Sequence, residues 1–202
     1  MNVFVDSVLN SMLDNLAALL DQASLHTAFS TTGANEVTGG TYARQTITWN
    51  AAAAGALDSS NAPSFAVPGG NTIRFIGFYD VTPSPDVWQG MIPNQQAADE
   101  GPRRFVVDTT ANTIEDPANA FVNDENLVFI GGTPPGGLVE GTVYFIVTRT
   151  ALDYGVAATQ GGASINLTSQ GDQDVRIWQI REETFASDGT FNLTDADIDF
   201  LT

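Results

Sequence analysis

The chain has 202 residues, which is enough for one domain or for one domain that carries a smaller inserted one. It contains no cysteine, so disulfides and thiolate metal sites are excluded. Its net charge is −17, from 24 acidic and 7 basic residues. Because affinity for a phosphate backbone depends on Lys and Arg, we expect no binding to nucleic acid. All seven basic residues are arginines: Arg44, Arg74, Arg103, Arg104, Arg149, Arg176 and Arg181.

The excess of negative charge has two interpretations. The first is that negative charge keeps the chain soluble. Alternatively, the acidic surface is an adaptation to a salty medium, in which counter-ions screen the self-repulsion within a Debye length of about 8 Å or less. A loss of folding cooperativity in low salt would favour the second interpretation.

The N-terminal segment carries the one clear helical pattern, over residues 3–23. Such a helix either lies across a sheet of its own subunit or pairs with copies of itself, because its apolar spacing also suits helix association. Acidic and amide side chains interrupt the run, so we predict no membrane span. A basic start and a small-residue cleavage site are both missing, so we predict no signal peptide. The apolar residues of the pattern recur at spacings of four and three: Val5, Leu9, Met12, Leu16, Leu19 and Ala23.

After Leu25 the pattern becomes typical of strands. Residues 41–49 alternate in side-chain character and are predicted to form one strand. Residues 71–80 (NTIRFIGFYD) are predicted to form another, with both of its faces partly covered. Residues 82–104 contain four prolines, so we predict an irregular connection there.

From Phe105 onwards, short apolar runs recur at even intervals and are separated by turn sequences, which is typical of a small barrel or sandwich. The closing segment is predicted to be a hairpin around residues 187–189. The sequence therefore predicts a mainly β fold: a β-sandwich or barrel core with one N-terminal amphipathic helix and an inserted small β-barrel-like module.

Several motifs of the chain resemble a family of small phage proteins that is usually called tail-fibre-like. The run LHTAFSTTGANEVTGGTYARQTITWNAA is followed by the strand PGGNTIRFIGFYD, and the chain closes with ETFASDGTFNLTDADIDF. In that family the core opens with LHTA…TG.NEV.GG.YARQ and ends with FA..GT..L. The resemblance covers residues 24–80 and 182–200, and its short motifs are specific through their order. The intervening segment is similar to a small β unit that recurs in phage tail and head proteins.

The resemblance implies three parts: an N-terminal helix over 1–23, a β core over 24–104 plus 181–202, and an inserted β module over 105–180. It also implies a virion structural protein of a tailed bacteriophage. The expected form is a homotrimeric tail fibre or tail-tip component that contacts other virion proteins or the host. One alternative is a trimeric capsid decoration (cement) protein that stabilises the head. Another is an adhesin that binds a glycan of the host surface.

Little in the sequence points to catalysis. His26 is the only histidine, and without cysteine it would have to serve a Ser–His or metal site alone. We predict a structural role for it, with its ring hydrogen-bonded at the junction of helix and strand. Motifs for an activated serine, a zinc protease or a phosphate loop do not occur. The acidic residues are interpreted as solvated rather than as the paired carboxylates of a glycosidase. We predict no enzymatic activity, no catalytic residues and no cofactor.

Two groups of side chains remain as candidate binding residues. Asp195, Asp197 and Asp199, or Asp172 with Asp174, could hold Ca²⁺, which prefers clustered oxygen ligands. However, Phe200 replaces the glycine that a calcium loop needs, and alternate strand residues lie about 6.5 Å apart, so no metal site is predicted. Four aromatic residues either stack on sugar rings or pack internally, and Trp88 is the best candidate for exposure. The four are Trp88, Tyr144, Tyr154 and Trp178.

Overall fold

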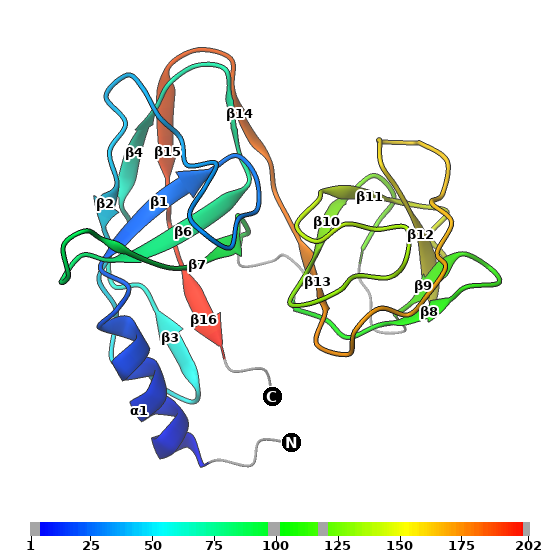
Figure 1. Ribbon diagram of the computed structural model, residues 1–202, viewed down its shortest axis with the longest axis horizontal. Coiled ribbons are helices and arrows are strands. Elements are labelled where there is room, and N and C mark those ends of the chain that lie inside the picture. The colour runs from blue at the N-terminus through cyan, green and yellow to red at the C-terminus, as the bar shows by residue number, and fades with distance from the viewer. Residues whose placement is uncertain (1–4, 97–101, 117–120, 200–202) are drawn as a thin grey trace. The chain divides into compact units, whose positions relative to one another are not determined.

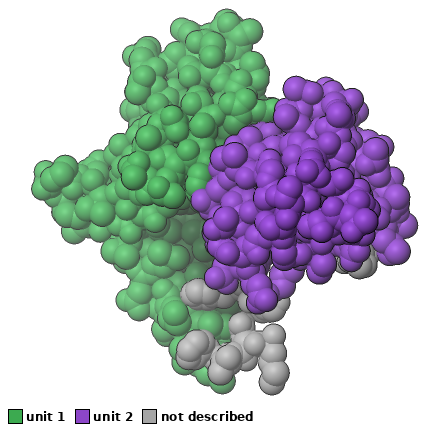
Figure 2. Space-filling view, turned by 45° about the vertical axis from the view of Figure 1, so that its right-hand side comes forward, with its two compact units in different colours: residues 1–94, 182–202 green, residues 95–181 purple. Residues whose placement is uncertain are grey.

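The structure is a computed structural model that describes residues 5–96, 102–116 and 121–199. It confirms a mainly β protein, with 37% strand and 6% helix, and one helix near the N-terminus. The chain forms two compact units, coloured separately in Figure 2. Unit 1 comprises residues 1–94 and 182–202, and unit 2 comprises residues 95–181. Within the described residues, no helix is long and apolar enough to cross a membrane.

Unit 2 begins earlier than residue 105, where the inserted module was predicted to start. Arg103 shows why, because its backbone exchanges two hydrogen bonds with Ile177, of 2.9 and 3.0 Å. Its side chain also forms an ion pair with the buried carboxylate of Asp116, at 2.7 Å. The proline-rich segment thus ends as part of unit 2. At the other junction, the predicted and observed boundaries differ by a single residue.

The main sheet of unit 1 has four antiparallel strands in the order β2–β1–β6–β7 (Figure 1). Every residue of the central strand β6 is buried, because strands flank it on both sides and side chains cover both faces. The faces of β6 are therefore covered more completely than the sequence predicted. The bounds are β1 Gln22–His26, β2 Gln45–Thr46, β6 Phe75–Asp80 and β7 Val87–Pro93.

Three sequence-based expectations in this unit were wrong in extent. The helix α1 spans Asp6–Ala17 rather than residues 3–23, because the chain beyond Leu20 joins the sheet. There the N–H of Asp21 donates to the carbonyl of Tyr79 at 3.0 Å. Only two residues of the predicted strand 41–49 form β2, and β7 lies within the supposed connection.

The C-terminal segment does not fold back on itself as the predicted hairpin. It runs antiparallel to residues 56–73 instead, in three consecutive ladders: β14 with β5, β15 with β4 and β16 with β3. The two paired segments bend together, and the N–H of Gly69 donates to the side chain of Asp188 at 2.9 Å. A Cβ atom on Gly69 would lie 2.7 Å from the Cα atom of Ser187, so glycine permits this approach. The bounds are β3 Ala56–Asp58, β4 Ser64–Val67, β5 Asn71–Ile73, β14 Glu183–Phe185, β15 Gly189–Asn192 and β16 Asp197–Asp199.

Unit 2 is one six-stranded antiparallel sheet in the order β13–β10–β11–β12–β9–β8 (Figure 1). The pairing of Arg103 with Ile177 joins the segment before β8 to β13, the strand at the opposite edge, so the sheet curls towards a barrel. Its own core includes Phe121, Phe129 and Tyr154, each with no exposed surface. The bounds are β8 Val106–Asp108, β9 Thr113–Glu115, β10 Asn126–Ile130, β11 Tyr144–Val147, β12 Asp153–Ala157 and β13 Arg176–Gln179.

Candidate functional site

The charged and aromatic residues of the LHTA…YARQ motif converge beside the main sheet of unit 1. The guanidinium group of Arg44 binds both carboxylate oxygens of Glu36, at 2.9 and 2.8 Å, and one oxygen of Asp86 at 3.0 Å. It also stacks on the ring of Tyr79, 3.4 Å from the centroid. A two-pronged Arg–carboxylate contact fixes both distance and orientation. We call the three motif residues and the two residues that they contact outside the motif the motif cluster: Glu36, Tyr42 and Arg44, with Tyr79 and Asp86.

Tyr42 fastens the motif cluster to strand β1. Its hydroxyl oxygen accepts the backbone N–H of Leu25 at 2.8 Å, and the hydroxyl donates to Glu36 at 3.3 Å. Burial raises the pKa of Tyr42, so the phenol stays protonated and able to donate. The loop between β1 and β2 is thereby held on the sheet at several points. The motif residues therefore form an internal brace, and none of them is left as an open reactive group.

His26 lies at the end of β1, rather than at the helix–strand junction where it was expected. Its side chain has no exposed surface. Nδ1 lies 2.9 Å from the carbonyl of Ala34, so Nδ1 carries the hydrogen and donates it. Nε2 then accepts the hydroxyl of Ser24, at 2.9 Å. Burial is the main cause that lowers the pKa of His26, so the ring is neutral at neutral pH.

The Ser24–His26 pair has the atoms of a nucleophile and its base, but it is enclosed. Ser24 has no exposed surface either. The ring of Trp88 lies 5.2 Å from the His26 ring, edge to face. A Cβ atom on Gly77 would lie 2.4 Å from Nε2 of His26, so the backbone closes the other approach. A substrate cannot reach the hydroxyl of Ser24 in this conformation, and the pair acts as a buried polar link between β1 and the loop that follows it.

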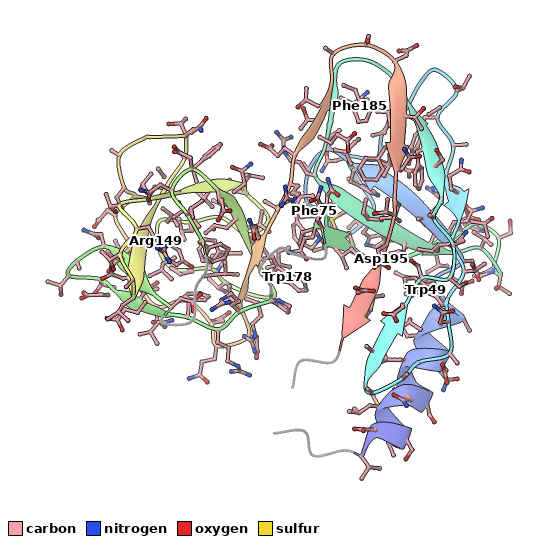
Figure 3. The ribbon with its side chains drawn as sticks, turned by 180° about the vertical axis from the view of Figure 1, so that it is seen from behind. Trp49, Phe75, Arg149, Trp178, Phe185 and Asp195 are labelled. Carbon is pink, nitrogen blue, oxygen red and sulfur yellow. The ribbon has the colours of Figure 1, made fainter. Side chains whose placement is uncertain are left out.

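The four aromatic residues that were candidates for sugar stacking do not form one surface. Trp88 is half-buried in β7, between His26 and Tyr79, so its expected exposure in an irregular connection was wrong. Tyr144 and Tyr154 are buried in the core of unit 2. Trp178 is half-buried on β13 and is labelled in Figure 3.

The acidic residues do not gather into a cation site where the structure describes them. Asp195, labelled in Figure 3, and Asp197 are exposed on the segment around β16, and the side chain of Asp199 lies outside the described part. Over the described ranges, no group of three His, Cys, Asp or Glu side chains could hold a metal ion. Asp172 accepts the backbone N–H of Thr133 at 2.9 Å, and this hydrogen bond lowers its pKa.

Helix α1 has two adjacent apolar faces, which the sequence pattern merged into one seam. Leu9, Leu13 and Leu20 are buried against unit 1. The second face is exposed, with side-chain exposures between 41% and 66%. At about 100° per residue, Val8 and Met12 lie about 40° apart on the helix, beside the buried face, and Val5 and Leu19 lie just beyond the two ends of the helix. We call this exposed set the α1 stripe: Val5, Val8, Met12 and Leu19.

The polar face of α1 is used within unit 1. The side-chain oxygen of Asn10 accepts the N–H of Gly55, and that of Asp14 accepts the N–H of Ala52, at 2.9 and 2.8 Å. These bonds hold the helix against the turn that precedes β3, alongside the β3–β16 ribbon (Figure 1). The helix therefore presents the α1 stripe in a fixed direction.

Comparisons with protein-family models, with curated protein sequences and with solved structures find no match to this chain.

Proposed function

We propose that the protein is a structural component of a tailed-phage virion, assembled in several copies through the α1 stripe as part of a tail fibre or tail tip. The assignment to a virion rests on the resemblance of the motifs to tail-fibre-like phage proteins. The single observation that supports assembly is the α1 stripe. Four of the ten large apolar side chains that are exposed in the described residues lie in this one segment. Clustered exposed apolar surface is typical of protein–protein contacts.

The spacing of the α1 stripe favours other copies of the same chain as its partner. Val5, at the N-cap, Val8 and Met12 follow the three–four alternation of a helix that packs against like helices, and Leu19 adds an exposed apolar side chain in the turn that follows the helix. In a bundle of such helices, Asn15 would also face the neighbouring helices. An amide buried at such a position favours one register of the helices over others. A symmetric bundle of these helices would bury the stripe of every copy at once.

Charge does not oppose this packing directly. Asp6 and Asp14 lie on the far side of the helix from the α1 stripe, and the positions that flank the stripe carry Leu9, Ser11 and Leu16. The repulsion between copies is therefore the long-range repulsion of chains with a net charge of −17. Salt screens such repulsion over about 8–10 Å. We expect association to strengthen as salt is added.

Analytical ultracentrifugation of the full chain at several concentrations and salt levels tests the assembly. We expect an oligomer for the wild type and a monomer for Met12→Glu, because the new charge would be buried in the bundle. Val139→Glu is the matched control, since Val139 is 63% exposed on unit 2 and the change in net charge is the same. Equal association of both variants and wild type would refute a role for the α1 stripe.

The position in a particle needs a separate experiment. An antibody against the protein, viewed on intact virions by electron microscopy, should label the tail. Labelling of the head lattice would replace the tail assignment by the capsid decoration role. Absence of the protein from purified virions would overturn the virion proposal as a whole.

A further inference from the structure

Unit 2 contains a cleft of about 330 Å³ between the chain that leads into β8 and the chain that leads into β13. This volume is at the lower end of the range for pockets that take small ligands. All of its lining residues belong to unit 2. Its polar and aromatic lining consists of Arg104, Phe105, Gln170, Asp172, Gln173 and Arg176.

The two arginines of this cleft differ from those that are engaged elsewhere. Arg44, Arg74 and Arg103 each form an ion pair with a carboxylate. Arg104 and Arg176 form none with any carboxylate of the described residues, although the chain has 24 acidic residues for 7 arginines. Two positive charges are thus brought to one cleft of a strongly acidic protein, with Asp172 in the same lining and Asp174 near Arg176.

The guanidinium group of Arg176 is held in place by the backbone next to it. Its Nη1 donates to the carbonyls of Gln173 and Val175, at 2.7 and 2.9 Å, which fixes the plane of the guanidinium group. Its Nε has no hydrogen-bond partner among the described residues, but it is shielded from solvent and therefore not open to a ligand in the cleft. Burial and the charge of Arg104 lower the pKa of Arg176, against a smaller opposing effect of Asp174. A bound oxyanion would relieve the repulsion between the two guanidinium groups.

The other walls of the cleft are suited to a hydroxylated ring. The amide of Gln170 bonds the backbone of Val107 and of Phe105, at 2.7 and 3.3 Å, so this wall is fixed. The half-buried ring of Phe105 packs edge to face on Phe129, 5.5 Å between centroids. Thr133 bonds the carboxylate of Asp172 through its backbone and its side chain, and a carboxylate has lone pairs beyond these with which it can accept a hydroxyl.

We propose that this cleft binds a carboxylated sugar, with the carboxylate between Arg104 and Arg176 and the hydroxyls towards Asp172 and Gln173. The negative charge of Asp172 selects against ligands with several charges and in favour of one carboxylate beside neutral hydroxyls. Such a sugar occurs free or as a unit of an acidic polysaccharide. This site is independent of the α1 stripe, which lies in unit 1.

The test titrates the isotope-labelled full chain with sodium glucuronate and follows backbone amide resonances. We expect saturable shifts at residues around β8 and β13 with glucuronate, and none with glucose at the same concentrations. Sodium acetate should bind more weakly than glucuronate. Equal binding of acetate would overturn the sugar part of the proposal, and equal binding of glucose would overturn the carboxylate part. An oligomer of glucuronate that binds more tightly than the monomer would identify the polysaccharide as the source.

Substitutions then locate the site. Arg104→Gln and Arg176→Gln should each weaken glucuronate binding about tenfold or more, the usual effect of losing a charged hydrogen bond. Arg149→Gln is the matched control, because Arg149 is exposed on the same unit and does not line the cleft. If Arg176→Gln does not fold, as judged by circular dichroism, Arg104→Gln decides alone, since its side chain is exposed. Unchanged binding in Arg104→Gln, or an equal loss in Arg149→Gln, would overturn the proposal.

Discussion

Acidification is expected to destabilise unit 1 through His26. This residue is the only histidine, so it is the one side chain whose ordinary pKa lies between pH 5 and 8. In the folded protein burial lowers its pKa below the usual 6.5, and both ring nitrogens are already engaged, by Ala34 and by Ser24. A proton added to Nε2 would have to be accommodated in a site with no exposed surface.

The sign and size of the effect follow from proton linkage. Because the pKa is lower in the folded state, the unfolded state binds more protons once the pH falls below about 6.5. The contribution of His26 is therefore fully present above pH 6.5 and is lost between there and its folded pKa. One proton changes the free energy of unfolding by at most about 1.4 kcal/mol per pH unit. Between about pH 6.5 and 5.5 the expected loss is thus up to about 1.4 kcal/mol.

Urea unfolding at about pH 7.5, 6.5 and 5.5 measures this loss in wild type and in His26→Gln, which cannot titrate in this range. We expect a decline in the wild type and a flat profile in the variant. The imidazole resonance of the wild type is a second readout, since a single histidine gives a single titration. A flat wild-type profile together with a resonance that titrates at or above pH 6.5 would refute the reasoning.

Three further predictions concern packing. Arg44→Lys should lower the free energy of unfolding by about 1–3 kcal/mol, measured by urea titration, because lysine cannot grip both oxygens of Glu36. Gly77→Ala should cost about 1–3 kcal/mol in the same assay, since the added methyl group overlaps the His26 ring; unchanged stability would contradict that closure. In calorimetry, Phe65→Ala and Phe129→Ala should each cost about 3–5 kcal/mol, but in different transitions, because each lies in the core of a different unit. A shift of one shared transition by both would contradict separate cores.

Much of the fold could be predicted from sequence because local patterns carry it. The apolar spacing indicates α1, and alternation with regular turns indicates β structure. The pairing of the C-terminal strands could not be predicted in the same way. Asp188 and Gly189 are typical hairpin residues, but Asp188 sits at a bend between β14 and β15, and Gly189 begins β15. The partners of those strands, β5 and β4, lie more than one hundred positions away, and nothing in the local sequence distinguishes the two pairings.

The candidate sites also differ in how far the sequence alone indicates them. The motif residues Glu36 and Arg44 lie in the run that carries the family resemblance, but the sequence alone does not indicate their ion pair. The α1 stripe could not be predicted from the sequence. Periodicity indicates that apolar side chains recur along a helix, but it does not indicate which of two adjacent apolar faces the rest of the protein covers. The pair Arg104 and Arg176 is brought together by the curling of the sheet in unit 2, and neither residue has a distinctive local context.

The division of unit 1 into two stretches of sequence has a consequence for biosynthesis. On the ribosome, β3, β4 and β5 emerge early but must wait for their partners until the whole of unit 2 has been translated. Unit 2 is contiguous, so it can finish folding while the nascent chain is still attached. The last strands to be made then complete the body that carries α1, and a chain released too soon would present unpaired strand edges.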